Sequence, residues 1–523
     1  MRARTKRRGR TTVRGLATSA ALVAVTIATV AIAPAPLASA VTAPSGARYT
    51  TSIVCATGSL TVRVDATGLA GSSLIQFSID DGGGAETYTV RRGQRRSETV
   101  DGSRFLASGI VDVAEGATPV ISADYDAACP NYEANQSVAP RARFVPITPD
   151  RILDTRPETR LNYTGGKPAA GGLFDLVVPG KASIPLNASA VVLNVTATEA
   201  GGPGFVQLFP AGRGTPGSSS NLNVERAGQT IPNAVIVPLG NGGAVSFFTQ
   251  VGTHLVADVS GYFVPVVGAT AAGRFIGTTP TRMLDTRPVS LIGYSGAKPG
   301  AGETVVANVL VPSGPAAAQV SAVVLNVTAT EATANGYVQV FPGGLRGLTS
   351  NLNVEAGQTA PNLVIVPISA TGTVSIFTQS GTHLLADVMG YFTSASVPAD
   401  TAGLFVPLSP ERIADSRPTS RIDGSDFTGA AGQTMTIFIG GLPFFELGAV
   451  ILNVTATESA AAGFVQVGPN LEPGQHSNLN LGRAGQTVPN AVLVPVNEVN
   501  ELDFYTQNGT QLIADIFGWF TAA

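Results

Sequence analysis

The sequence predicts an all-β protein, in which a small disulfide-closed β-sandwich precedes three tandem modules of β-sandwich or jelly-roll type. Three observations support this prediction. Val, Ile, Thr and Phe, which favour strands, are frequent, whereas 60 Gly and 35 Pro disfavour helices. No stretch has the 3.6-residue periodicity of an amphipathic helix. Short alternating segments separated by turns instead recur in three copies, as in sandwiches and jelly rolls.

Residues 1–40 have the pattern of a secretory signal peptide. A basic start without acidic residues leads into an apolar run from Leu16 to Ala33, and Ala38-Ser39-Ala40 provides a cleavage site. The same run is just long enough for a membrane anchor, which is the alternative.

Cleavage removes seven positive charges and changes the formal net charge from −3 to −10. Such an acidic product disfavours nucleic acid and anionic lipid as partners. We therefore expect a secreted protein with no membrane contact after cleavage, held at the cell surface, if at all, by noncovalent contacts.

Residues 41–135 are expected to form the N-terminal β domain. Alternating segments occur at 59–64, 74–79 and 86–90, and 131–141 is polar like a linker. Cys55 and Cys129 are the only two cysteines in the chain. In an exported protein, an isolated pair most simply forms one disulfide, which would close this domain.

The remainder of the chain repeats one pattern three times. Each copy opens with an Asp-x-Arg-Pro turn and closes with an Ala-Asp-aliphatic strand, and the opening aspartates recur after 131 and 130 residues. A period of this length indicates whole domains rather than solenoid repeats. The predicted modules span 142–266, 272–395 and 402–521, joined by short Pro-containing linkers.

The first module shows how the strands are assigned. Alternation and turn residues predict six strands, with one or two earlier strands near 173–178. The six are 190–198, 204–209, 221–224, 234–238, 244–249 and 254–262.

Several repeated phrases resemble a known group of proteins. Val192–Thr198, Ser350–Val354, Gly357–Thr359 and Gly381–Asp387 are similar to the tandem modules of about 125 residues in secreted actinobacterial proteins. The resemblance covers about 70% of the chain. It implies a secreted accessory or surface module without assigned catalytic activity, and it supplies no active-site residues.

The Asp-x-Arg turns and the closing-strand aspartates are candidate sites. A carboxylate and a guanidinium two residues apart, followed by Pro, suit a rigid turn with a charge-assisted pair. These residues form either an internal latch, which ties the opening turn to the closing strand, or a ligand site. Calcium is disfavoured because its usual oxygen-rich loops are missing, and we expect no metal and no cofactor. The candidates are Asp154, Arg156, Asp258, Asp285, Arg287, Asp387, Asp415, Arg417 and Asp515.

A second candidate site is the Asn-x-Thr-x-Thr strand of each module. Alternation places the polar side chains on one face and the apolar ones toward the core. Such a face can bind sugar hydroxyls, and an aromatic at the end of the closing strand can stack on a sugar ring. The alternatives are an ordinary solvated face and a core aromatic. The glycan-contact candidates are Asn194, Thr196, Tyr262, Asn326, Thr328, Tyr391, Asn453, Thr455 and Trp519.

Catalysis is not expected. The histidine of the closing strand, His254 or His383, becomes Gln511 in the third copy, so the modules share no base. We expect a secreted noncatalytic binding or structural protein that contacts a cell-envelope polymer or extracellular glycan by avidity. One alternative is a surface adhesive or spacer with a protein partner. The other is an extracellular hydrolase, for which Glu199, Glu331 and Glu458 would contribute to a carboxylate pair.

Overall fold

The computed structural model describes the backbone of eight N-terminal strands and, in full, residues 140–422, 427–439 and 446–522. The chain forms two compact units, residues 1–135 and 136–523. Most of the predicted signal peptide, both cysteines and most of the predicted linker at 131–141 lie outside the described residues.

The N-terminal unit contains two four-stranded antiparallel sheets, with orders β1-β2-β3-β6 and β5-β4-β7-β8. Strand β1 includes Ala40, so cleavage after this residue would remove most of the strand. The strands are β1 (Leu37–Thr42), β2 (Arg48–Val54), β3 (Ser59–Asp65), β4 (Ile75–Asp80), β5 (Ala85–Val90), β6 (Arg95–Val100), β7 (Ile110–Glu115) and β8 (Thr118–Asp124).

The first module has eight strands in two antiparallel sheets, β14-β11-β16-β9 and β10-β15-β12-β13. Numbered within the module, these orders are 6-3-8-1 and 2-7-4-5, which is the double Greek key of a jelly roll. Its strands are β9 (Ala142–Asp154), β10 (Gly172–Val177), β11 (Ala190–Thr198), β12 (Gly204–Pro210), β13 (Leu222–Val224), β14 (Ile231–Pro238), β15 (Ala244–Thr249) and β16 (His254–Pro265). Two short 3₁₀ helices, η1 (Pro157–Thr159) and η2 (Asn241–Gly243), lie in its loops.

The other two modules repeat this order of strands. The second contains β17 (Phe275–Asp285), β18 (Glu303–Asn308), the 3₁₀ helix η3 (Ala317–Gln319), β19 (Val320–Thr330), β20 (Gly336–Phe341), β21 (Leu352–Val354), β22 (Ala360–Pro367), β23 (Thr373–Thr378) and β24 (His383–Thr393). The third contains β25 (Phe405–Asp415), β26 (Thr434–Phe438), β27 (Leu447–Thr457), β28 (Gly463–Gly468), β29 (Leu479–Leu481), β30 (Val488–Pro495), β31 (Glu501–Thr506) and β32 (Gln511–Thr521). The all-β prediction is confirmed, and the predicted strands agree with β10–β16 to within about three residues. The long opening strand of each module was not predicted.

Each module buries the strand of its Asn-x-Thr-x-Thr motif on both faces. One face of β11 places Val191, Leu193 and Val195 in the core between the two sheets. The opposite face, which begins with Ala190 and Val192, packs against the other modules. The sheet that contains β11 therefore lies between two cores, and its strands are almost continuously buried.

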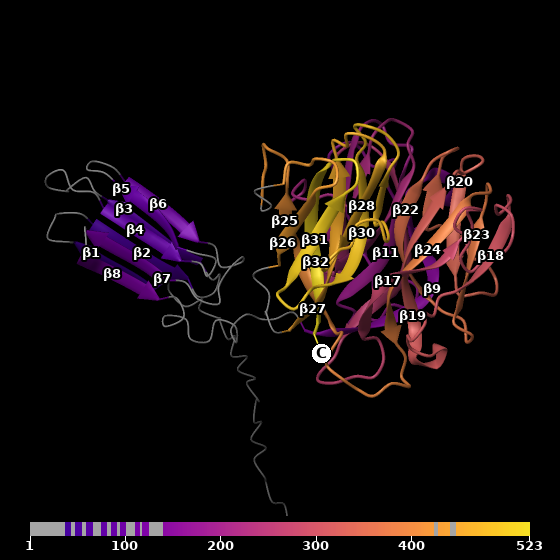
Figure 1. The fold of residues 1–523 in the computed structure, drawn as a ribbon, viewed down its shortest axis with the longest axis horizontal. Coiled ribbons are helices and arrows are strands. Elements are labelled where there is room, and N and C mark those ends of the chain that lie inside the picture. Colours follow the sequence, from indigo (N-terminus) through magenta and orange to yellow (C-terminus); the bar gives the residue numbers. More distant parts are fainter. Residues whose placement is uncertain are drawn as a thin grey trace, which may run out of the picture. The chain divides into compact units, whose positions relative to one another are not determined.

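Six phenylalanines, two from each module, join the three modules in a shared core. In each pair, one ring lies near the start of the opening strand and the other near the end of the closing strand. Phe144 of the first module lies 4.3 Å from Phe392 of the second, and Phe263 lies 4.3 Å from Phe405 of the third, measured between ring centroids. Phe275 and Phe520 complete the cluster, with centroids 5.0 Å apart. Figure 1 shows the strands of the three modules gathered into one body.

The segments predicted as linkers are integrated into this body. Thr270 of the first linker and Asp400 of the second exchange backbone hydrogen bonds of 2.9 and 3.1 Å. Gly273, with φ +79°, accepts a hydrogen bond from the Phe144 backbone, and a Cβ at Gly273 would lie 2.1 Å from the Phe144 carbonyl oxygen. The segments predicted as short linkers thus also hydrogen bond to each other and to residues beside them.

Candidate functional sites at the module interfaces

The asparagines of the Asn-x-Thr-x-Thr motif lie between modules. Asn194 on β11 donates from Nδ2 to the Ser350 carbonyl of the second module (2.6 Å). Its Oδ1 accepts from Nδ2 of Asn362 on β22 (2.8 Å), and Asn362 Oδ1 accepts from the Ala234 backbone of the first module (3.0 Å). Two amide side chains thus connect the first module to the second in both directions.

The same hydrogen bonds recur at the other two interfaces, and they close a ring. Asn326 of the second module pairs with Asn490 of the third (3.0 Å), and Asn453 of the third pairs with Asn233 of the first (2.8 Å). Head-to-tail contacts form a closed ring when the rotation between copies brings the last back to the first. The three modules of this single chain are arranged in this way.

This geometry corrects the predicted glycan face. The motif residues are at most 8% exposed, because the next module covers them. A buried strand face offers no surface to a polymer. The residues concerned are Asn194, Thr196, Asn326, Thr328, Asn453 and Thr455.

The aromatic candidates are also packed inside the unit. Tyr391 is fully buried, and its hydroxyl donates to the Val309 carbonyl (2.8 Å). Trp519 is 1% exposed, and Tyr262 is half-buried against the core of the first module. The core interpretation of these residues therefore holds, and the stacking interpretation is wrong for Tyr391 and Trp519.

The closing-strand aspartates pair with arginines that the sequence analysis did not single out. Asp258 on β16 accepts from Nε and Nη2 of Arg151 on β9, at 2.8 and 3.2 Å. Arg282 binds Asp387 and Arg412 binds Asp515 in the same bidentate geometry. Arg151 also donates to the Leu348 carbonyl of the second module (3.2 Å). These pairs join the first and last strands of a module beside its interface with the next module.

The Asp-x-Arg turns are bound internally. Asp154 accepts from the backbone, Nε and Nη2 of Arg156, and from the Thr159 hydroxyl. Asp285 and Asp415 repeat this arrangement with Arg287 and Arg417, with Ser290 or Ser420 as the hydroxyl donor. The carboxylates are fully buried, and their hydrogen bonds fix the turn after the opening strand.

The turn is joined to the closing strand through its middle residue. The Thr155 hydroxyl accepts from the Leu255 backbone (2.9 Å) and lies 3.0 Å from Nδ1 of His254. In the third module Ser416 replaces the threonine, and its hydroxyl donates to Oε1 of Gln511 (2.6 Å). In the third module the hydroxyl donates and the glutamine carbonyl oxygen accepts. If the Thr155 hydroxyl donates in the same way in the first module, His254 Nδ1 is the acceptor. The His-to-Gln exchange thus preserves a hydrogen bond.

The net pKa shifts of the turn aspartates and of two closing-strand aspartates are opposite, although burial raises the pKa of both. Burial raises the pKa of Asp154, but hydrogen bonds from Arg156 and Thr159 outweigh it, so the pKa of this carboxyl lies below its usual range. For Asp258 and Asp515, burial outweighs the arginine hydrogen bonds and raises the pKa. The turn carboxylates therefore stabilise the fold as anions, whereas ionisation of Asp258 and Asp515 opposes folding.

The acidic residues considered for a hydrolase end the motif strands. Glu199, Glu331 and Glu458 adopt left-handed backbone conformations with φ of 52–54°. The side chains of Glu199 and Glu331 are about two-thirds exposed, and each carboxylate lies 3.8–3.9 Å from Nε2 of the closing-strand histidine. In the fully described residues, no cluster of His, Cys, Asp and Glu could hold a metal ion. No helix in that part of the chain is long and apolar enough to cross a membrane.

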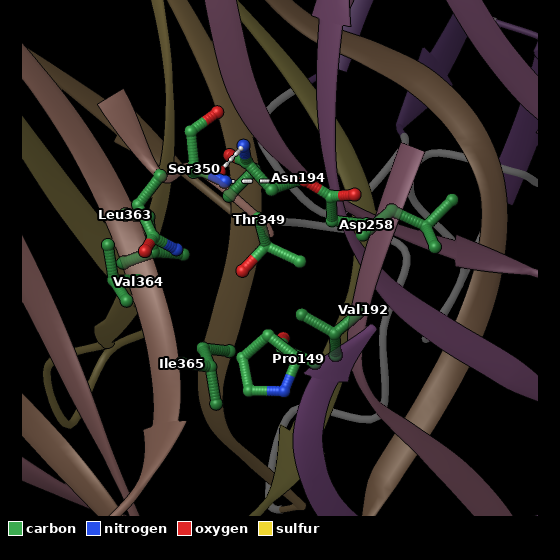
Figure 2. Close-up of a pocket in the computed structure, with 13 residues that line it drawn as sticks. Pro149, Val192, Asn194, Asp258, Thr349, Ser350, Leu363, Val364 and Ile365 are labelled. Atoms are coloured by element: carbon green, nitrogen blue, oxygen red, sulfur yellow. Dashed lines mark hydrogen bonds between the residues drawn. The ribbon is translucent and has the colours of Figure 1, made fainter. Parts of the chain in front are cut away.

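A small cavity marks the interface between the first and second modules. It has a volume of about 20 Å³, enough for one water molecule. Figure 2 shows Asn194 and Asp258 of the first module meeting Ser350 of the second, with Thr349 beside them. This cavity holds nothing larger than a water molecule.

Comparison with known proteins adds no functional information. The sequence matches no protein-family model and no curated protein. One similar solved structure is described as the atomic structure of Sulfolobus Turreted Icosahedral Virus, with 9% identity, a TM-score of 0.14, and 73% of this chain and 92% of that chain covered. Another is described as the triple jelly roll fold and turret assembly in an archaeal virus. It has 9% identity and a TM-score of 0.15, and the match covers 73% of this chain and 91% of that chain. Similarity at this level carries no argument about function.

Proposed function

We propose that this chain is a secreted, noncatalytic binding or structural protein that contacts a cell-envelope polymer or extracellular glycan. Its three modules act as one body rather than as three separately tethered binders. The export pattern of residues 1–40, the resemblance to secreted actinobacterial modules and a Cys55–Cys129 disulfide belong to this proposal.

The observation that carries the proposal is the use of the repeated polar residues. The Asn-Asn hydrogen bonds connect one module to the next, and the arginine–aspartate pairs connect the two end strands of each module beside that interface. The chemistry that the three copies share therefore serves assembly. A partner would be recognised by surfaces on which the copies differ, so the proposal does not rely on avidity among three identical sites.

A protein partner is the second candidate. Leu345 and Leu348, in the loop between β20 and β21, are 98% and 91% exposed. The corresponding loops of the other modules have the sequences Ala211–Ser220 and Pro469–Ser477, which lack this pair of leucines at exposed positions. A contact with a protein partner would cover these two apolar side chains.

Co-sedimentation with purified cell walls tests the proposal. The full chain without its predicted export signal is mixed with intact walls and, separately, with walls stripped of their polysaccharides. We expect it to pellet with the intact walls, to pellet much less with the stripped walls, and to stay in solution without walls. An absence of pelleting with intact walls would contradict the proposal and favour the protein-partner alternative.

A further inference from the structure

The three module interfaces are not equivalent, because the loops before β14, β22 and β30 differ in charge. Arg226 of the first module pairs with Glu355 of the second, and Arg483 of the third pairs with Glu225 of the first (2.8 Å). The interface between the second and third modules would need an arginine after Glu355 and a glutamate at 482. The chain has Ala356 and Gly482 at these positions. Both partners of the third ion pair are missing together.

A groove is present where this ion pair is missing. It has a volume of about 860 Å³, and most of its lining comes from the second and third modules, with Glu225, Arg226 and Gln229 contributed by the first. The cavity between the first and second modules is only about 20 Å³. A groove of 860 Å³ lies within the usual range for small-molecule sites.

Every arginine that lines the groove is already paired with a carboxylate. The four arginines are Arg226, Arg282, Arg287 and Arg483. Two of these carboxylates, Glu225 and Glu355, also line the groove. A ligand of high charge of either sign would therefore compete with existing ion pairs, so the lining favours a neutral ligand.

The uncharged part of the lining is rich in amides and hydroxyls. Gln475 and Gln507 are exposed, Ser477 and Asn480 are half-buried, and the ring of Phe464 is half-buried beside them. Amides and hydroxyls both donate and accept hydrogen bonds, as sugar hydroxyls do. An accessible aromatic ring adds an apolar face for a sugar ring.

His476, which also lines the groove, has an unused hydrogen-bonding atom. It is 8% exposed, and its Nε2 is buried without a hydrogen-bond partner among the described residues. Gln466 Oε1 accepts from the Gly474 backbone, which orients the Gln466 amide so that Nε2 faces Nδ1 of His476 at 3.3 Å. Nδ1 is then the acceptor, and Nε2 carries a proton with no acceptor. In the first two modules, a serine or threonine occupies this position and is hydrogen bonded to the corresponding glutamine.

We propose that the groove between the second and third modules binds a neutral saccharide chain. Sugar hydroxyls contact Gln475, Gln507 and Asn480, and one sugar ring lies against Phe464. This inference deepens the proposed function, on which it rests, because it assigns the glycan contact to one asymmetric groove. Of the six candidate residues on the repeated strand face, only Thr328 is among the residues that line this groove.

Calorimetric titration of the chain with defined neutral oligosaccharides tests the groove. Short linear gluco-, manno-, galacto- and arabino-oligosaccharides are the probes, with an oligogalacturonate as the charged comparison. We expect at least one neutral probe to bind and the charged one to bind more weakly. Phe464→Ala should weaken the binding about tenfold, and Gln475→Ala, at an exposed position that leaves the fold intact, about fivefold.

Phe205→Ala is the matched control, because Phe205 occupies the corresponding position in the first module, packs on Phe248 as Phe464 packs on Tyr505, and lies outside the groove. The Phe205→Ala variant should bind the neutral probe with the same affinity as the unmodified chain. Binding of no neutral probe, or equal affinity in all variants, would overturn the groove proposal. If the Phe464 and Gln475 variants still pellet with cell walls as the unmodified chain does, the groove assignment fails while the proposed function stands.

Discussion

The interface asparagines use every hydrogen-bonding group of their amides. Asn362 is fully buried; it donates to Asn194 Oδ1 and the Asn351 carbonyl and accepts from the Ala234 backbone. A buried amide in low dielectric stabilises the structure only when all its partners are in place. Because two of its bonds reach the first module, to Asn194 and Ala234, Asn362 acts as a structural link between modules.

Replacement of this residue has a predictable cost. Asn362→Ala leaves the Ala234 amide, the Asn351 carbonyl and Asn194 Oδ1 without their partner, and each unsatisfied buried group costs about 1–3 kcal/mol. Allowing for relaxation, we expect the free energy of unfolding to fall by about 2–4 kcal/mol. Denaturant titration measures this change in the free energy of unfolding. Asn353→Ala, at a half-buried position on β21, is the control and should change stability by less than about 1 kcal/mol. Equal losses in the two variants would contradict the linking role.

At the scale of single elements, the opening strand of each module ends in a charged turn that binds the closing strand. In the second module, Arg282 on β17 connects Asp387 on β24 to Asp285 at the turn, at 2.8 and 3.5 Å. Charges of alternating sign thus extend from the closing strand through the opening strand to Arg287. This series of ion pairs joins the first and last strands of the module to the turn.

The turn carboxylates make the stability of the unit sensitive to acid. Because hydrogen bonds hold the pKa of Asp285 below its usual value despite burial, its stabilisation is complete above about pH 4 and is lost as the pH falls through the folded-state pKa. Asp285→Asn cannot ionise. We expect this variant to be about 1.5–3 kcal/mol less stable at neutral pH and to converge with the unmodified chain at low pH.

Denaturant titrations between pH 7 and pH 2 provide the comparison. Asp150→Asn, at an exposed position on β9, serves as the control and should follow the unmodified chain throughout. Parallel curves for Asp285→Asn and the unmodified chain, without convergence in acid, would show that the ionised carboxylate does not stabilise the turn.

The sequence predicted seven of the eight strands of the first module, β10–β16, because alternation and turn residues are local signals. It correctly assigned Leu193 and Val195 to one face of β11 and Asn194 and Thr196 to the other. It did not reveal that the polar face is buried, because the atoms that satisfy it lie more than 150 residues away in the chain. Asn233, Asn362 and Asn490 also repeat in all three copies, as do Arg151, Arg282 and Arg412, so repetition alone could have identified both sets.

For the whole molecule, the ring is closed by contacts between its two ends. Phe405 at the start of the third module pairs with Ala142 at the start of the first, and Arg141 binds Glu446 at 2.8 Å. Together with the Arg483–Glu225 pair, these contacts connect the last module directly to the first. The phenylalanine cluster belongs to all three modules, so no module retains its complete core when another unfolds.

This shared core predicts that residues 136–523 unfold in one cooperative transition. Phe392→Ala, in the second module, removes a ring that contacts Phe144, Phe275 and Phe520, and should cost about 3–5 kcal/mol. Trp519 is the only tryptophan of the chain and is buried in the third module, so its fluorescence reports that module alone. If the modules unfold together, Phe392→Ala lowers the midpoint of the tryptophan transition as much as the calorimetric midpoint.

Val338→Ala, in the internal core of the second module, should shift the same tryptophan signal by a smaller amount, because it removes fewer buried atoms. A tryptophan transition that stays in place while calorimetry shows part of the chain melting earlier would mean that the modules fold independently.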